Sequence, residues 1–147
     1  MDQTGLVRFW LDTSLILRLL TGEPPELASH ALEVFRKAAA GEYVLAVHPL
    51  VVAEAFYTLH SFYRVPKGEA ARALLALLDR QGLEVREKDV LFQALREAGQ
   101  GGLSLVDAYL VFLAKGGRGR EGIATLDQGI VKGARREGIL LLEAGLP

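Results

Sequence analysis

The most constraining feature of this chain is an apolar run that ends in a single carboxylate. Residues 7–11 read Val-Arg-Phe-Trp-Leu, Asp12 follows, and a second apolar run begins at Leu15. This pattern predicts a first β-strand over Val7–Leu11 and a short helix over Ser14–Leu20, with a turn at Asp12 between them. Ligands of open α/β sheets bind at the carboxyl ends of the strands, so Asp12 occupies a position where functional groups are expected.

Strand-like and helix-like segments alternate along the rest of the chain. Apolar residues recur at helical spacing in the longer segments, and Pro, Gly and Ser residues mark most boundaries. Further strands are predicted over Tyr43–Val47, Leu83–Arg86, Gly122–Leu126 and Ile139–Leu142; helices are predicted over Glu26–Ala39, Leu50–Tyr63, Asp89–Ala98 and Ile130–Arg136, with two more opening at Pro66 and Ser104. This alternation predicts an α/β fold with a mainly parallel sheet. A length of 147 residues predicts a single domain, 1–147.

Composition excludes several classes of protein. The chain has no cysteine, which excludes disulfides and thiolate metal sites. Its formal net charge is -1, so any contact with nucleic acid must use a local basic patch. No apolar run approaches the roughly 20 residues of a membrane span, and residues 1–5 lack the basic region of a signal peptide. A cytoplasmic location is the default expectation.

Four carboxylates stand in apolar stretches of the sequence. They are Asp12, Glu54, Asp107 and Asp127. An isolated buried carboxylate is costly unless it is paired or binds a cation, and basic residues are scarce beside these four. Carboxylate oxygens suit hard cations such as Mg²⁺ or Mn²⁺, so the pattern predicts a divalent metal site.

Structural roles are open for each of these acids. Asp12 is a suitable cap for the helix that follows it. Glu54 could lie on the solvent-facing side of a helix whose other sides are buried. The spacing of Ser104 and Asp107 is similar to a capping box, and Asp127 is also typical of a turn before Gly129. The combination of the four favours the metal site over these separate roles.

The order of these motifs resembles the PIN-domain nucleases, and in particular VapC-type toxins of prokaryotic toxin–antitoxin pairs. The likeness rests on Leu-Asp12-Thr-Ser-Leu-Ile-Leu, on Glu54 in an apolar helix, on Ser104-Leu-Val-Asp107-Ala-Tyr-Leu and on Ala-Thr125-Leu-Asp127. The resemblance covers nearly the whole chain. It implies a three-layer α/β/α fold with a mainly parallel five-stranded sheet.

The same resemblance implies a function. The acidic quartet would hold one or two Mg²⁺ or Mn²⁺ ions and hydrolyse RNA phosphodiester bonds, with Ser14 and Thr125 supporting the site. A homodimer and a cognate antitoxin protein are the implied partners. Phosphate-binding candidates are Arg18, Arg118, Arg120, Lys132, Arg135 and Arg136, for which a solvated surface is the competing interpretation.

Two other functions compete with an endoribonuclease toxin. One is a non-catalytic RNA-binding or protein-interaction module with a PIN-like fold, which the intact quartet disfavours. The other is a phosphotransfer receiver, but the strand over Tyr43–Val47 ends in His48-Pro49 and not in a phosphoacceptor aspartate. His48 itself is interpreted as structural.

Overall fold

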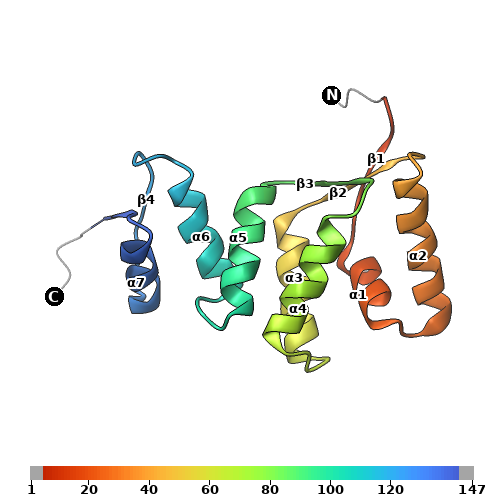
Figure 1. Ribbon diagram of the computed structural model, residues 1–147, viewed down its shortest axis with the longest axis horizontal. Coiled ribbons are helices and arrows are strands. Elements are labelled where there is room, and N and C mark those ends of the chain that lie inside the picture. Colours follow the sequence, from red (N-terminus) through yellow and green to blue (C-terminus); the bar gives the residue numbers. More distant parts are fainter. Residues whose placement is uncertain (1–4, 143–147) are drawn as a thin grey trace. The chain divides into compact units, whose positions relative to one another are not determined.

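The computed structural model describes residues 5–142, and they divide into two compact units. Unit 1 extends to Glu87 and unit 2 begins at Lys88. Each unit is described by itself below, with its elements labelled in Figure 1. The prediction of a single domain over 1–147 stays a prediction.

Unit 1 contains three parallel strands and four helices among its described residues. The strands are β1 (Arg8–Trp10), β2 (Val44–Val47) and β3 (Leu83–Val85), in the order β1-β2-β3. The helices are α1 (Thr13–Thr21), α2 (Pro25–Ala39), α3 (Pro49–Ser61) and α4 (Lys67–Leu78). Parallel neighbours need a crossover connection, and here each crossover is a pair of helices.

The register of this sheet aligns β1 and β3 on β2. Phe9 is paired with Leu45 and Leu45 with Leu83. β2 is almost completely buried, as expected for the middle strand of a covered parallel sheet. An ion pair between Arg8 and Glu84 joins the two outer strands. The carboxyl ends of β1 and β2 therefore lie together, and they lead to Asp12 and His48.

The core of unit 1 is formed by one face of each helix. Phe35 of α2 and Phe56 of α3 are nearly fully buried, as are Ile16, Val52 and Leu74. α1 packs on α2 and on α3, and α3 packs on α4. The leucines at 74, 77 and 78 are buried in this core, so they do not provide an exposed surface for a partner.

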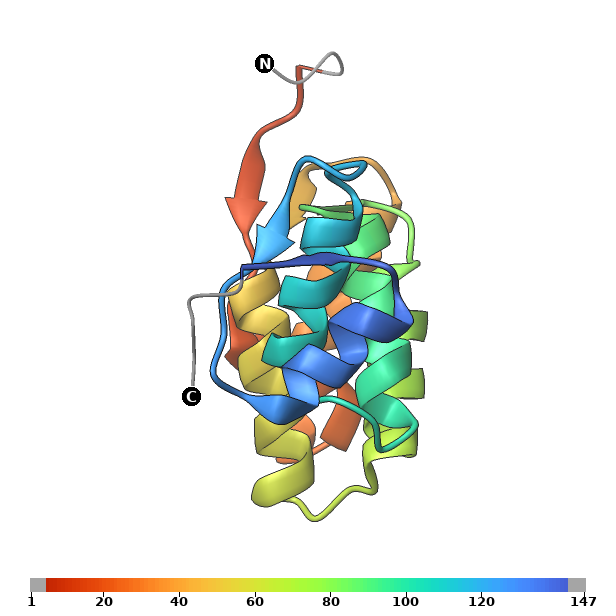
Figure 2. The same ribbon diagram turned by 90° about the vertical axis from the view of Figure 1, so that its left-hand side faces the viewer.

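Unit 2 contains α5 (Lys88–Gly99), α6 (Leu105–Lys115), β4 (Gly122–Ile123), α7 (Gln128–Arg136) and β5 (Leu140–Leu141). Figure 2 shows α5, α6 and α7 side by side, and α6 contacts both of the others. A small core joins α6, α7 and the strand pair through Val111, Ile123, Ile130, Ala134 and Ile139. β4 and β5 are parallel, with Gly122 opposite Leu140.

The structure confirms an α/β fold with parallel strands and corrects the expected sheet. Its described strands form a three-stranded and a two-stranded sheet, not one sheet of five. The predicted strand Gly122–Leu126 is paired only over Gly122–Ile123, so β4 is shorter than expected. Gly122 fits because a Cβ there would lie 2.4 Å from the Leu140 carbonyl oxygen. Within residues 5–142, no helix has the length and apolar composition of a membrane span.

Candidate functional site

Asp12 caps α1 through one of its carboxylate oxygens. The Ser14 hydroxyl donates to Asp12 Oδ2 at 2.7 Å, and the Ser14 backbone N–H donates to the same oxygen at 3.3 Å. These bonds hold the pKa of Asp12 below its ordinary value, because they stabilise the ionised carboxylate. Both hydrogen bonds from Ser14 are accepted by Oδ2 and not by Oδ1. The capping role is therefore real, and it leaves an oxygen that can bind a cation.

Asp127 repeats this arrangement at the start of α7. Its Oδ1 accepts a hydrogen bond from the Ile130 backbone N–H at 2.9 Å, and Oδ2 has no partner among the described residues. The Asp127 backbone N–H donates to Thr125 Oγ1 at 3.0 Å. Thr125 thus fixes the turn that carries Asp127. Three residues separate Asp127 from the end of β4, so it does not directly terminate the strand as predicted.

The other two acids project from helices. Glu54 lies on α3, and Asp107 is the third residue of α6. The Asp107 backbone N–H donates to the Ser104 hydroxyl at 3.2 Å, which supplies one half of the expected capping box. Neither carboxylate forms a hydrogen bond or an ion pair within the described part of the chain. Both are available as oxygen donors.

The burial on which the sequence argument relied is absent. Asp12, Glu54 and Asp127 are exposed, and Asp107 is half-buried. On α3 the apolar neighbours of Glu54 point the other way, because Ala55 and Phe56 belong to the buried face. Desolvation therefore does not demand a cation at these positions. The case for a metal rests on the type and number of the donors instead.

Each unit provides two of the four predicted acids. Asp12 and Glu54 belong to unit 1, and Asp107 and Asp127 belong to unit 2. Within residues 5–142, no three acidic or histidine side chains gather closely enough to bind a metal. The donor set still fits a hard cation, since every donor is a carboxylate oxygen and none is paired with a base. These are the residues that could hold Mg²⁺ or Mn²⁺.

The predicted phosphate-binding residues separate into two groups. Arg136 pairs with Glu97 at 3.0 Å and with Glu137 at 3.2 Å, and Arg18 donates to the Glu23 backbone carbonyl at 3.1 Å. These two cations are engaged within the chain. The others form no ion pair within residues 5–142 and remain available for phosphates: Arg118, Arg120, Lys132 and Arg135.

Glu137 is the centre of the ion-pair network in unit 2. Lys115 Nζ lies 2.8 Å from Glu137 Oε1, and Arg136 contacts the other oxygen. The Lys115 ammonium is the main reason that the pKa of Glu137 lies below its ordinary value. The sequence showed these charges but not their pairing, because Lys115 and Glu137 are 22 residues apart.

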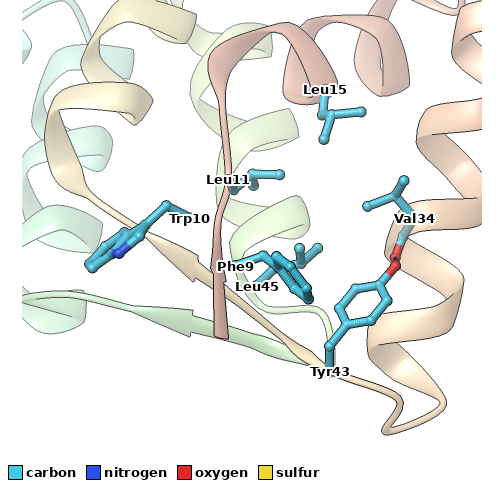
Figure 3. A pocket seen from close by; sticks show the side chains of 7 residues that line it. All are labelled: Phe9, Trp10, Leu11, Leu15, Val34, Tyr43 and Leu45. Carbon is cyan, nitrogen blue, oxygen red and sulfur yellow. Dashed lines mark hydrogen bonds between the residues drawn. The ribbon is translucent and has the colours of Figure 1, made fainter. Parts of the chain in front are cut away.

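Sequence reasoning missed an apolar cavity of about 300 Å³ that is open at the surface of unit 1. Figure 3 shows Phe9, Leu15, Val34 and Tyr43 around it, between β1 and α2. The Tyr43 hydroxyl donates to the Val34 carbonyl oxygen at 2.6 Å. None of the four acids lines the cavity, so it is separate from the candidate chemistry.

His48 has the structural role that the sequence suggested. Its Nδ1 accepts a hydrogen bond from the Leu50 backbone N–H at 3.1 Å and caps α3. Its ring lies 6.5 Å from the Trp10 ring, measured between centroids. The Arg86 guanidinium lies 5.5 Å from the Trp10 ring centroid. These contacts join the carboxyl ends of the three strands of unit 1.

Comparison with known proteins adds one finding. The family model of the PIN domain matches residues 9–135. No curated protein and no solved structure matches the chain. The matched stretch includes all four acids, together with Ser14 and Thr125.

Proposed function

The chain belongs to the PIN domain family, and on that premise we propose that it is a divalent-metal-dependent endoribonuclease. Proteins of this family are typically metal-dependent ribonucleases. The observation that carries the proposal is the match over residues 9–135, a range in which all four carboxylates of the predicted site lie. A degenerate member of the family would be expected to lack one or more of these acids.

The proposed metal ligands are Asp12, Glu54, Asp107 and Asp127. Asp12 would bind through Oδ1 and Asp127 through Oδ2 or a bridging water, because the other oxygen of each caps a helix. When bound, Mg²⁺ or Mn²⁺ would lower the pKa of a water molecule and offset the charge of the phosphodiester. Ser14 would keep Asp12 ionised and oriented, and Thr125 would hold the turn that presents Asp127.

A group of acids repels the RNA backbone, so the substrate needs cations nearby. Arg118, Arg120, Lys132 and Arg135 are the proposed phosphate contacts. Lys132 and Arg135 lie three residues apart on α7 and share its exposed side, opposite the buried Ile130 and Ala134. Contacts of this type fix the position of the RNA without reading its sequence.

The finer assignment is a toxin of a VapC-type pair that acts as a homodimer and binds an antitoxin. Its support is the motif resemblance in the sequence. Co-expression of the adjacent reading frame with this chain would test it: an upstream gene for a small protein that binds the chain and suppresses cleavage is expected. A chain encoded without such a neighbour would contradict the toxin role and leave the nuclease proposal intact.

Cleavage of a structured RNA tests the enzymatic proposal. The wild type should cut with Mg²⁺ or Mn²⁺ and not with EDTA, and Asp12→Asn should abolish cutting. Asparagine is also a good helix cap, so this variant should keep its fold. The matched control is Asp89→Asn, which removes an exposed carboxylate from the first turn of α5.

Two results would contradict the proposal. Cutting that survives Asp12→Asn in a folded protein would remove the metal site from the reaction. Metal-independent RNA binding without cleavage would favour a non-catalytic RNA-binding module instead. The fluorescence of Trp10, the only tryptophan of the chain, reports on the fold of unit 1 in Asp12→Asn, and circular dichroism reports on the helices of unit 2 in Asp89→Asn.

A further inference from the structure

The side chain next to Asp12 has an unusual environment for a polar group. Among residues 5–142, Thr13 is the one buried residue with a polar side chain, and 5% of its surface is exposed. Its hydroxyl donates to the Val51 backbone carbonyl oxygen at 3.4 Å. Thr13 is the first residue of α1, and Val51 lies in the first turn of α3. The bond therefore ties together the amino-terminal ends of two helices that are separated by 38 residues in the chain.

We propose that Thr13 is a positioning residue that fixes Asp12 relative to Glu54. Asp12 is directly bonded to Thr13 in the chain, and Glu54 lies three residues after Val51 on the same helix. The path from one carboxylate to the other thus contains one peptide bond, one hydrogen bond and less than one helical turn. This inference rests on the proposed function, because it assigns the two acids to one metal site.

A metal ion shared by Asp12 and Glu54 would require such a restraint. Two carboxylates that bind one cation would lie about 4 Å apart, where they repel by roughly 4 kcal/mol at an effective dielectric constant near 20. Within residues 5–142, neither Asp12 nor Glu54 has a basic partner to offset that repulsion. Without a restraint between the two helices, the metal ion would have to order both acids as well as overcome their repulsion.

The hydroxyl is not needed to fill the core or to satisfy a buried group. Valine has nearly the shape of threonine, and the Val51 carbonyl lies in a helix where a backbone N–H also reaches it. Replacement of a bonded hydroxyl by an apolar group of the same shape costs little stability when no partner is left unsatisfied. Thr13→Val should therefore change the geometry of the site more than the stability of unit 1.

Mn²⁺ affinity, measured by calorimetry, provides the first readout. Thr13→Val should weaken Mn²⁺ binding roughly three- to tenfold, the range expected for the loss of one hydrogen bond. It should lower kcat and leave the KM for RNA unchanged, because Thr13 contacts no phosphate-binding residue. Thr13→Ser should restore both values, because it keeps the hydroxyl.

The control is Thr21→Val at the other end of α1. The Thr21 hydroxyl donates to the Leu17 carbonyl oxygen at 2.7 Å and accepts from the Glu23 backbone N–H at 3.4 Å, so the control removes at least as much hydrogen bonding from the same helix. It should leave Mn²⁺ affinity and kcat unchanged. Equal effects of the two valine variants, or a serine variant that behaves like the valine variant, would overturn the inference.

A metal-free measurement separates this inference from the proposed function. Spin labels on Arg18→Cys and Leu50→Cys report the distance between α1 and α3, and the chain has no native cysteine that would react. The wild-type background, Thr13→Ser and Thr21→Val should give one narrow distance distribution, which Thr13→Val should broaden. An unchanged distribution in Thr13→Val would overturn the inference. Broadening in a protein that binds no Mn²⁺ would uphold the positioning and refute the metal site.

Discussion

Gly82 lies immediately before β3, and its backbone approaches the end of α2 closely. Its φ is +88°, and a Cβ added there would lie 2.4 Å from both the carbonyl carbon and the carbonyl oxygen of Ala38. These atoms belong to the backbone, so they cannot rotate away. Gly82→Ala would therefore combine a strained φ with a steric clash, in the residue whose carbonyl accepts a hydrogen bond from the Leu45 backbone N–H.

The two costs can be estimated separately. A non-glycine residue in the left-handed region costs about 1–2 kcal/mol. Overpacking against backbone that cannot yield adds about 1–3 kcal/mol. We expect Gly82→Ala to lower the free energy of unfolding of unit 1 by about 2–5 kcal/mol. Urea unfolding monitored by Trp10 fluorescence measures this quantity.

Gly41→Ala is the matched control for the strain. Gly41 has a φ of +85°, and a Cβ there would meet nothing within 4 Å. It should therefore pay only the conformational cost, about 1–2 kcal/mol. Equal losses of stability in the two variants would refute the reasoning, because the close approach to Ala38 would then contribute nothing.

Three further predictions concern charged groups. Ser14→Ala should return the pKa of Asp12 toward its ordinary value of 3.8. Because the bonds from Ser14 depress this pKa, they stabilise the wild type above about pH 3.8, and this stabilisation is lost as the pH falls through the folded-state pKa. Titration of the Asp12 carboxyl by NMR measures the pKa in both proteins. A pKa in Ser14→Ala equal to that of the wild type would contradict the prediction. Glu97→Gln should destabilise unit 2 by about 1–3 kcal/mol, because Glu97 accepts charge-assisted bonds at 3.0 Å from the Arg136 side chain and the Leu103 backbone N–H. Thermal unfolding followed by circular dichroism measures this loss, and a variant as stable as the wild type would refute the prediction. Lys132→Ala should reduce the slope of log RNA affinity against log salt by about 0.7, the contribution of one phosphate contact on a single strand; an unchanged slope in a binding titration would remove Lys132 from the interface.

Much of the local structure was predictable because it depends on neighbours in the chain. The sequence predicts that Asp12 ends a strand and begins a helix, and the structure confirms both. Ser104 caps α6 as expected, since capping requires only residues two or three positions apart. The period of the apolar residues also identified most buried helix faces.

The candidate site was predictable in its chemistry but not in its environment. The sequence identified four carboxylates with suitable spacing, and the family match includes them all. It wrongly indicated that Asp12, Glu54 and Asp127 are buried. The apolar neighbours of Glu54 occupy the opposite side of α3, and the two aspartates lie at exposed helix caps. It also could not distinguish Arg136, which is neutralised by Glu97 and Glu137, from Lys132, which has no ion-pair partner within the described residues.

The sequence by itself determined the order of strands and helices, the caps and the set of oxygen donors, since these depend on local propensity and on residue type. Tertiary structure decided which strands pair, which side chains are exposed and which charges meet. It also decided that the Thr13 hydroxyl reaches Val51 across 38 residues. The physical reason is that pairing and burial depend on the approach of segments that are distant in the chain, and no pattern within one segment specifies its partner.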